Sequence, residues 1–511
     1  MKKLLISIDT HAEKVAVEKL IKYKRAEVIG QLLPSKGSNL ELSCLNFKNL
    51  HYEEIIVKLG LLNWHSNKAS NQDIKLLEAA EHYAPIFYDM CQRFDTKKNH
   101  RFEERRRLWQ YLLMYWSGIQ EKTQFNLVYF SNTPHEPSTF TLYIFAKLSQ
   151  CKVFLLQENS ILDTRVLVSD IYAKWQSLEL ENDSKSSSEL ARERALIDSI
   201  GEAMDRKKNE EPYWLLESKQ KAIAAKLLRK REKKGHRVLN IIKGLKGIIK
   251  NEVSDIKLNY SLNGIDSKVM FVLDLVFGVS SQYRSIYNFR LCYREYLECV
   301  ARGEAIIDNS TIVFFLSYNP ENSVNPLGKS YFQQFLAISQ IYSALPKGLR
   351  LIVKEHPSQF NQYAAGYNYV GRELGFYKNI QSLGVDIITD EISSQELLGK
   401  CLAVATISGT VGWEASIIGK PVLLFGTTWY EESPNIIRVN PQSNLMEILN
   451  NLREYTDVFT KSSLLNFVQK CFDSSLYLPS RTSIYNNMPD IDKENIQIRW
   501  DNLFATISGN V

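Results

Sequence analysis

A polar stretch that follows a hydrophobic run contains side chains able to bind an anion. In the segment GLRLIVKEHP, Lys354, Glu355, His356 and Pro357 come directly after apolar residues. Lys354 and His356 would lie on one side of an extended strand and Glu355 on the other, because side chains alternate along a strand. Pro357 forces the chain off the sheet. An imidazole there could hold a phosphate or a ribose, although a lone histidine at a strand end more often has a structural role.

A second stretch, ATISGTVGWEASIIGKPVLLFG at 405–426, collects hydroxyl groups at the start of a helix. Ser408, Gly409 and Thr410 lead from a predicted strand directly into a predicted helix. The free backbone N–H groups of a helix N-terminus bind phosphate. Glu414 follows about one turn later, within reach of a ribose or a base. The alternative is that the hydroxyl groups only cap the helix.

Three acidic residues that follow strands in the first half of the chain are candidates for the catalytic base or nucleophile. Asp9 follows LLISI, Glu136 lies beside His135 in TPHEP, and Glu158 lies in QEN. A carboxylate can deprotonate an attacking hydroxyl group or form a covalent intermediate. The alternative is that these acidic residues only lie in Pro-bounded turns or are solvent-exposed, and the sequence by itself favours this alternative.

These candidates require a parallel α/β framework. Residues 126–132, 139–150 and 152–159 predict a strand, a helix and a strand, which is a βαβ unit with a right-handed crossover. From about 305, four consecutive βα steps predict a doubly wound α/β domain that binds ligands at the carboxyl ends of its strands. The strands of this second domain are predicted at 310–318, 348–357, 385–389, 402–409 and 420–426.

The pattern divides the chain into two domains and a tail. We expect a first domain over 1–300, a second over 301–475, and a C-terminal segment over 476–511 that packs back on the first domain. Residues 178–250 interrupt the first domain as a helical, basic insertion, which begins with a capping box at Ser186-x-x-Glu189. Its basic run at 219–237 is either a solvated helix face or a contact with anionic lipid or a polyanionic acceptor.

Composition narrows the class of protein. A formal charge of +6 over 511 residues does not indicate a nucleic-acid-binding protein, and no recognition motif accompanies the basic run. The seven cysteines form no C-x-x-C motif, which predicts a reducing, cytoplasmic location and no structural zinc. The apolar run near the N-terminus is shorter than that of a signal peptide, and no stretch is long enough to span a membrane. Any membrane contact would therefore be peripheral.

Three motifs resemble those of a known family. They are Y-N-P-E at 318–321, V-K-E-H-P at 353–357, and A-T-I-S-G-T-V-G-W-E-A-x-x-x-G-K-P-V-x-x-F-G at 405–426. Together they resemble the capsule polysaccharide biosynthesis family, which is similar to bacterial Kdo transferases and, more distantly, to GT-B sialyltransferases with a His-Pro motif. The resemblance is strong over about 310–430, weaker at 131–137 and 157–158, and negligible over 178–280.

The resemblance implies a GT-B fold, in which two Rossmann-like domains face a cleft and the C-terminal domain binds a nucleotide-sugar. Carried over by motif, His356 would contact the phosphate or nucleotide of the donor, Ser408 and Thr410 the phosphate, and Glu414 the ribose or base. Glu321 matches a family motif to which no role is assigned here. The acidic-Asp-Gly motif of the sialyltransferases is not visible, so the catalytic residue and the stereochemical course stay open.

The leading hypothesis is a metal-independent glycosyltransferase that requires no cofactor and acts on a capsule or lipopolysaccharide glycan. A CMP-activated Kdo-like or nonulosonic sugar is the favoured donor. The leaving phosphate would be stabilised by a helix dipole, backbone N–H groups, Lys354 and His356. The alternatives are a UDP-sugar-dependent transferase, a sugar-nucleotide epimerase of the same fold, and a non-catalytic nucleotide-binding factor for assembly or export.

Overall fold

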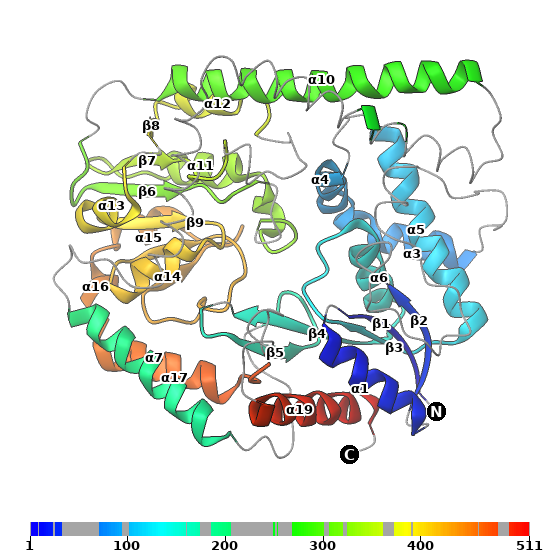
Figure 1. Ribbon diagram of the computed structural model, residues 1–511. Coiled ribbons are helices and arrows are strands. Elements are labelled where there is room, and N and C mark those ends of the chain that lie inside the picture. The colour runs from blue at the N-terminus through cyan, green and yellow to red at the C-terminus, as the bar shows by residue number, and fades with distance from the viewer. Residues whose placement is uncertain are drawn as a thin grey trace.

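The chain forms two α/β domains joined by helices that cross between them (Figure 1). The computed structural model describes residues 2–8, 10–23, 26–32, 71–94, 102–159, 161–173, 185–205, 249–250, 253, 268–300, 306–319, 324–360, 372–389, 392–457, 459–478 and 490–509. Asp9, Glu321 and the basic run 219–237 lie outside these ranges.

The first domain contains a five-stranded sheet in the order β2-β1-β3-β4-β5. Its first four strands are parallel, and β5 runs antiparallel to β4. The βαβ unit predicted from the sequence is present as β3, α6 and β4. The strands are β1 (Lys3–Ser7), β2 (Glu27–Leu32), β3 (Leu127–Phe130), β4 (Lys152–Asn159) and β5 (Thr164–Val168).

Helices cover both faces of this sheet, which explains why β3 and the interior of β1 are continuously apolar instead of alternating with polar residues. On β1, Leu5 packs among the helices of one face, whereas Leu4 and Ile6 pack with α1 and α19 on the other. The first face carries α3 (Asn71–Ala80), α4 (Ala84–Phe94), α5 (Phe102–Thr123) and α6 (Pro137–Leu148), with the short η2 (Glu81–Tyr83) between α3 and α4; the second carries α1 (His11–Lys22) and α19 (Asp490–Ser508).

The second domain contains a six-stranded parallel sheet in the order β11-β10-β9-β6-β7-β8. The first strand, β6, lies in the middle; the chain adds β7 and β8 on one side and then crosses to add β9, β10 and β11 on the other. This is the strand order of a Rossmann fold, and it reverses between β6 and β9. The strands are β6 (Thr311–Phe315), β7 (Arg350–Lys354), β8 (Asp386–Ile388), β9 (Ala403–Thr406), β10 (Val422–Leu424) and β11 (Ile436–Arg438).

This second sheet is also buried on both faces. Ile312 and Phe314 of β6 pack into one apolar cluster, and Val313 and Phe315 into another. The spacing Ser393-x-x-Glu396 predicts a capped helix over 393–401, and Ser393 indeed caps α13 (Ser394–Lys400), because its hydroxyl accepts the Glu396 N–H at 3.1 Å. The helices are η3 (Lys329–Phe332), α11 (Gln334–Ser343), α12 (Phe376–Ser382), α13 (Ser394–Lys400), α14 (Thr410–Ile417), α15 (Leu445–Asn450) and α16 (Glu454–Asp457).

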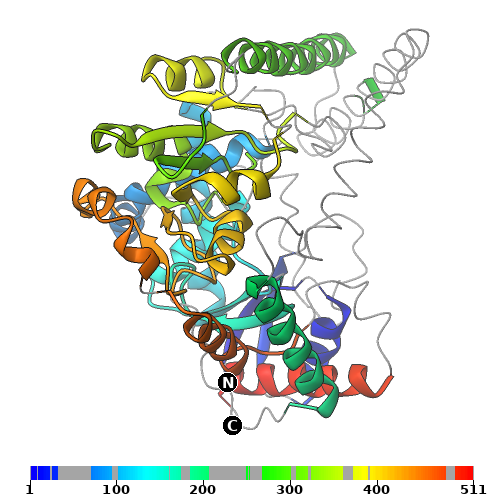
Figure 2. The same ribbon diagram turned by 90° about the vertical axis from the view of Figure 1, so that its left-hand side faces the viewer.

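Both domain boundaries differ from those expected from the sequence. The sequence assigns 1–300 to the first domain, but α10 (Lys268–Cys299) places Phe289, Cys292 and Tyr296 in the core of the second. Helix α10 lies along the edge of the second domain, whereas α19 lies at the opposite end of the molecule (Figures 1 and 2). Likewise, α17 (Lys461–Asp473) packs with α7 and the first-domain core before residue 475 is reached.

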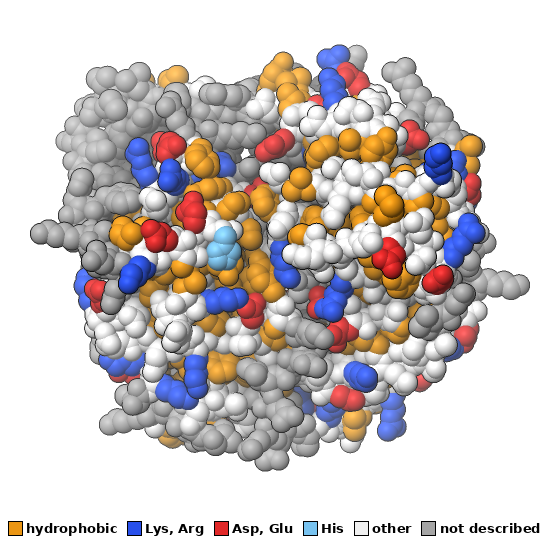
Figure 3. All heavy atoms as spheres, turned by 180° about the vertical axis from the view of Figure 1, so that it is seen from behind, with side chains coloured by type: hydrophobic (Ala, Val, Ile, Leu, Met, Phe, Trp, Pro, Cys, Tyr) orange, Lys and Arg blue, Asp and Glu red, His pale blue; other side chains and the backbone are white. Residues whose placement is uncertain are grey.

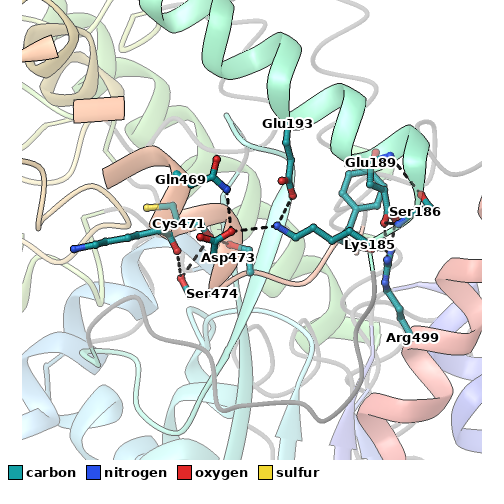
Figure 4. A network of polar contacts seen from close by, with 12 residues as sticks. Lys185, Ser186, Glu189, Glu193, Gln469, Cys471, Asp473, Ser474 and Arg499 are labelled. Carbon is teal, nitrogen blue, oxygen red and sulfur yellow. Dashed lines mark hydrogen bonds and ion pairs between the residues drawn. The ribbon is translucent and has the colours of Figure 1, made fainter. Parts of the chain in front are cut away.

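A network of charged side chains ties the C-terminal segment to the first domain (Figure 4). Glu189 on α7 (Ser187–Asp205) accepts two hydrogen bonds from Arg499 on α19, one of them at 2.6 Å, and both side chains are buried. Lys185 pairs with Glu193 at 2.6 Å and lies 3.6 Å from Asp473 of α17. The C-terminal helix therefore packs on α1 and α7, where the sequence places the C-terminal segment.

The predicted capping box at the start of α7 is present: the Glu189 N–H donates to Ser186 Oγ at 3.3 Å, and the Ser186 N–H donates to Glu189 Oε2 at 2.8 Å. Lys, Arg, Asp and Glu side chains are interspersed over the described part of the face shown in Figure 3. In the described ranges, none of the helices combines the length and apolar character needed to cross a bilayer.

The two domains also touch directly through the segment that leads into η3. Asn325 Nδ2 of the second domain donates to the Ile86 carbonyl at 3.0 Å and to Asp89 Oδ2 at 2.8 Å. The Tyr172 hydroxyl donates to the Pro326 carbonyl at 3.3 Å. The chain thus has the two-domain α/β architecture of the GT-B type that was predicted, with the domains in fixed contact.

Candidate functional site

Glu355 is held in the interior of the second domain. Its carboxylate accepts hydrogen bonds from Arg372 Nε at 2.8 Å and Nη2 at 2.7 Å, and the two side chains are 1% and 2% exposed. The Tyr377 hydroxyl donates to the same carboxylate at 2.5 Å, and the His356 backbone N–H donates at 2.6 Å. The role of Glu355 is therefore to fix the loop that carries His356.

His356 is a neutral hydrogen-bond donor in this structure. The Ser358 N–H donates to its Nδ1 at 3.1 Å, so Nδ1 has a lone pair and the ring proton is on Nε2. Burial lowers the pKa of His356 to about 4, and the positive charges of Arg372 and Lys354 act in the same direction. At neutral pH the ring is uncharged, and it could bind a phosphate through its Nε2–H but not as a cation.

Lys354 and Pro357, which flank Glu355 and His356, have different environments. Lys354 is 2% exposed, so its ammonium group is covered by the protein, although the sequence places it beside the phosphate. Its charge still acts on the ring of His356, because it helps to lower the pKa of that ring. Pro357 is exposed where the chain leaves the sheet.

The N-terminus of α14 has no side-chain cap. Gly409 is the N-cap residue, with φ −69° and ψ 150°, and it has no side chain to cap the first turn. Ser408 is buried and Thr410 is exposed. A side chain at 409 would bring its Cβ to 2.9 Å from Thr406 Oγ1, so this position requires glycine. The simple capping alternative therefore does not explain the hydroxyl groups here, and N–H groups of the first turn remain available to an anion.

Glu414 is partly buried one turn into α14. Its Oε2 atom is buried and has no hydrogen-bond partner within the described ranges. Burial raises the pKa of Glu414 to about 7, so the carboxyl group titrates near neutral pH. Tyr430, which is buried nearby, has its own pKa raised by burial and by the charge of Glu414. A ribose hydroxyl or a base N–H group could supply the missing hydrogen bond.

The strand order brings these groups together. Strands β9, β6 and β7 are neighbours, so the loops that carry Gly409, Ser317 and His356 leave the same edge of the sheet side by side. Gln359 joins two of these loops, because it accepts from the Asn319 N–H at 2.9 Å and donates to the Asn319 carbonyl at 2.8 Å. This edge includes the point where the strand order reverses, at which Rossmann folds bind ligands.

The residues that hold this site were not predicted from the sequence. Arg372, Gln359 and Gln334 are buried and bond to the loops after β6 and β7. No local pattern identifies them, since each reaches a partner 17 to 55 residues away. Ser317 was detectable in principle, because it is the first polar residue after the apolar run of β6.

The acidic candidates of the first domain lie in different settings. Glu136 is the N-cap residue of α6 and forms a capping box with Thr139, whose Oγ1 accepts the Glu136 N–H at 3.3 Å. Glu158 is exposed on β4 and lies opposite Arg165 of β5. Glu136 follows β3, Glu158 lies near the end of β4, and these two strands are neighbours. No hydrogen bond joins Glu136 to Glu158 within the described residues. Asp9 and Glu321 lie outside the described ranges.

His135 has the tautomer opposite to that of His356. Its Nδ1 lies 2.7 Å from the Thr133 carbonyl and must donate the hydrogen bond, since a carbonyl oxygen only accepts. In the neutral ring, Nε2 then carries the lone pair.

Comparison with known families agrees with the motifs. Residues 328–463 match the family described as capsule polysaccharide biosynthesis protein. The resemblance expected from the sequence is therefore confirmed over the stretch that contains His356 and the N-terminus of α14. No curated protein matches the chain.

The chain is similar to two solved structures at low sequence identity. The beta Kdo 2,7 transferase of Thermosulfurimonas dismutans KpsC has 11% sequence identity and a TM-score of 0.26, with 78% of this chain and 88% of that chain covered. The UDP-GlcNAc 2-epimerase of Neisseria meningitidis, bound to UDP-GlcNAc, has 13% identity and a TM-score of 0.22, with 93% and 99% covered. At TM-scores this low, neither likeness carries an inference about function.

Proposed function

We propose that this chain is a glycosyltransferase that moves a sugar from a nucleotide-sugar donor to a capsule or lipopolysaccharide glycan. A CMP-activated Kdo-like or nonulosonic sugar is the favoured donor, on the basis of the motif resemblance. The observation that carries the proposal is the convergence of His356 and the uncapped N-terminus of α14 on one sheet edge. The capsule family match covers the same residues.

The proposed chemistry follows from the charge that develops on the leaving nucleotide. As the bond from the sugar to the phosphate breaks, negative charge grows on a phosphate oxygen. The positive end of the α14 dipole, N–H groups of its first turn and His356 Nε2–H would stabilise that charge. No cluster of three or more potential metal ligands occurs among the described residues. We propose that these groups act without a metal or cofactor.

The acceptor hydroxyl needs a group that removes its proton. Glu136, Glu158 and Asp9 of the first domain are the proposed candidates, as a general base or as the nucleophile of a double displacement. Of the two described carboxylates, Glu158 is the more available because Glu136 already takes part in a capping box. The acceptor would be a glycan or glycolipid at the cytoplasmic side of the membrane, with peripheral contact through 219–237.

A binding screen followed by product analysis tests this proposal. CMP, CDP, UDP and GDP are added separately to the full-length protein, and the melting temperature is measured, since a ligand of the folded state raises it. We expect CMP to give the largest shift and His356→Ala to remove that shift while the unliganded melting temperature stays the same. If His356→Ala bound CMP as tightly as the wild type does, and UDP as tightly as the wild type does, the assigned site would be ruled out.

Product analysis then separates the alternatives. The protein is incubated with the CMP-activated or UDP-activated sugar with and without a glycan acceptor. Sugar transfer only in the presence of acceptor supports a transferase. Conversion of the nucleotide-sugar without acceptor would identify an epimerase instead. Nucleotide binding with neither reaction, together with an essential 219–237 segment, would support a non-catalytic factor.

A further inference from the structure

Ser317 has a buried hydroxyl group that the fold does not use. The residue is 5% exposed and directly follows β6 and Leu316. Its Oγ atom is buried and forms no hydrogen bond within the described part of the chain. A buried polar group without a partner lowers stability, so its presence needs an explanation.

The backbone of Ser317 is held rigidly from both sides. Its N–H donates to Gln334 Oε1 at 2.8 Å, and its carbonyl accepts from Gln334 Nε2 at 3.0 Å. Arg372 Nη2 donates to the same carbonyl at 2.8 Å. The three bonds fix the residue without its side chain, so the hydroxyl is not needed to place the loop.

The hydroxyl lies beside the uncapped helix N-terminus. A Cβ atom built on Gly409, the N-cap residue of α14, would stand 3.9 Å from Ser317 Oγ. Ser317 follows β6 and Gly409 follows β9, the two strands between which the strand order reverses. The hydroxyl is thus next to the groups best placed to receive a phosphate, and it is an uncharged donor.

We propose that Ser317 is a phosphate-binding residue, whose hydroxyl donates a hydrogen bond to a phosphate oxygen of the nucleotide held at the N-terminus of α14. This inference rests on the proposed function and assigns a residue that the sequence motifs do not include. The Oγ atom is covered in this structure, so a phosphate reaches it only after the atoms that cover it are displaced.

The test compares a nucleotide with its nucleoside. Affinities of the full-length wild type and Ser317→Ala are measured by calorimetry for CMP and cytidine, or for UDP and uridine if the wild type prefers uridine nucleotides. Ser343→Ala, on the exposed side of α11, is the control. We expect Ser317→Ala to weaken nucleotide binding about ten-fold or more, because the lost bond involves a charged acceptor. Nucleoside binding and the control should not change.

Stability provides a second readout. Removing an unpaired buried hydroxyl should leave the melting temperature of the unliganded Ser317→Ala protein unchanged or raise it. A lower melting temperature, or equal weakening of nucleotide and nucleoside, would make the role structural and overturn the proposal. Unchanged nucleotide affinity would overturn it while leaving the proposed function intact. Failure of the wild type to bind any nucleotide would overturn both.

Discussion

Replacing Glu355 by glutamine tests the structural basis of the site most directly. The substitution keeps the size and shape of the side chain but removes its negative charge. Arg372 would then be buried, at 2% exposure, without an opposing charge, and the bonds from Arg372, Tyr377 and the His356 N–H would all weaken. We expect Glu355→Gln to lower both stability and nucleotide affinity.

The magnitude follows from burial. Breaking a buried ion pair by neutralising one partner costs about 3–5 kcal/mol, because the other charge stays desolvated. The matched control is Glu396→Gln, which breaks the exposed pair with Lys400, whose side chains are 51% and 55% exposed. An exposed pair of this kind contributes about 0.3–0.5 kcal/mol. The two carboxylates should therefore differ by about ten-fold in their effect on the free energy of unfolding.

Chemical denaturation followed by tryptophan fluorescence measures this difference. Because the chain has two domains, the transition assigned to the second domain is the relevant one. The double variant Glu355→Leu with Arg372→Met should recover part of the lost stability, since no unpaired charge remains. The recovery is partial because the Tyr377 hydroxyl, the His356 N–H and the Ser317 carbonyl each lose a hydrogen-bond partner. A loss in Glu355→Gln no larger than that in Glu396→Gln would show that the pair is not desolvated, and the argument for a fixed His356 loop would fail.

Further substitutions test the titration of Glu414, the tautomer of His356 and the role of the first-domain carboxylates. The folded-state pKa of Glu414, about 7, lies above the ordinary 4.5, so its stabilising contribution is complete below pH 4.5 and is lost as pH rises toward 7. The free energy of unfolding of Glu414→Gln, measured relative to that of the wild type, should therefore be up to about 3 kcal/mol higher at pH 8 than at pH 4.5. Denaturation profiles that change with pH equally in the two proteins would contradict this. His356→Gln, which places an N–H near the Nε2 position, should retain more CMP affinity than His356→Asn in calorimetry; the reverse order would contradict the assigned tautomer. Glu136→Gln or Glu158→Gln should abolish turnover while nucleotide affinity is kept, and wild-type rates in both variants would exclude both carboxylates.

Local patterns were sufficient for most individual elements. The apolar runs that became β1, β3, β4, β6, β7 and β9 were predicted at nearly their observed bounds, because strands buried on both faces are continuously apolar. The capping residues Ser186 and Ser393 were also predicted, since a cap acts over three residues. The six-residue β2, the antiparallel β5, which contains Arg165, and the three-residue β11 were missed because their patterns are weak.

The spacing of residues in the sequence predicted that this protein has two α/β domains and that His356 and the 408–410 segment follow strands of the same parallel sheet. Only the tertiary structure decided which groups serve the site. It turned Glu355 inward to Arg372, covered Lys354, placed α10 on the second domain, and brought Ser317 beside Gly409. The physical reason is that burial and pairing depend on side chains far apart in the chain, whereas strand and helix patterns depend on near neighbours.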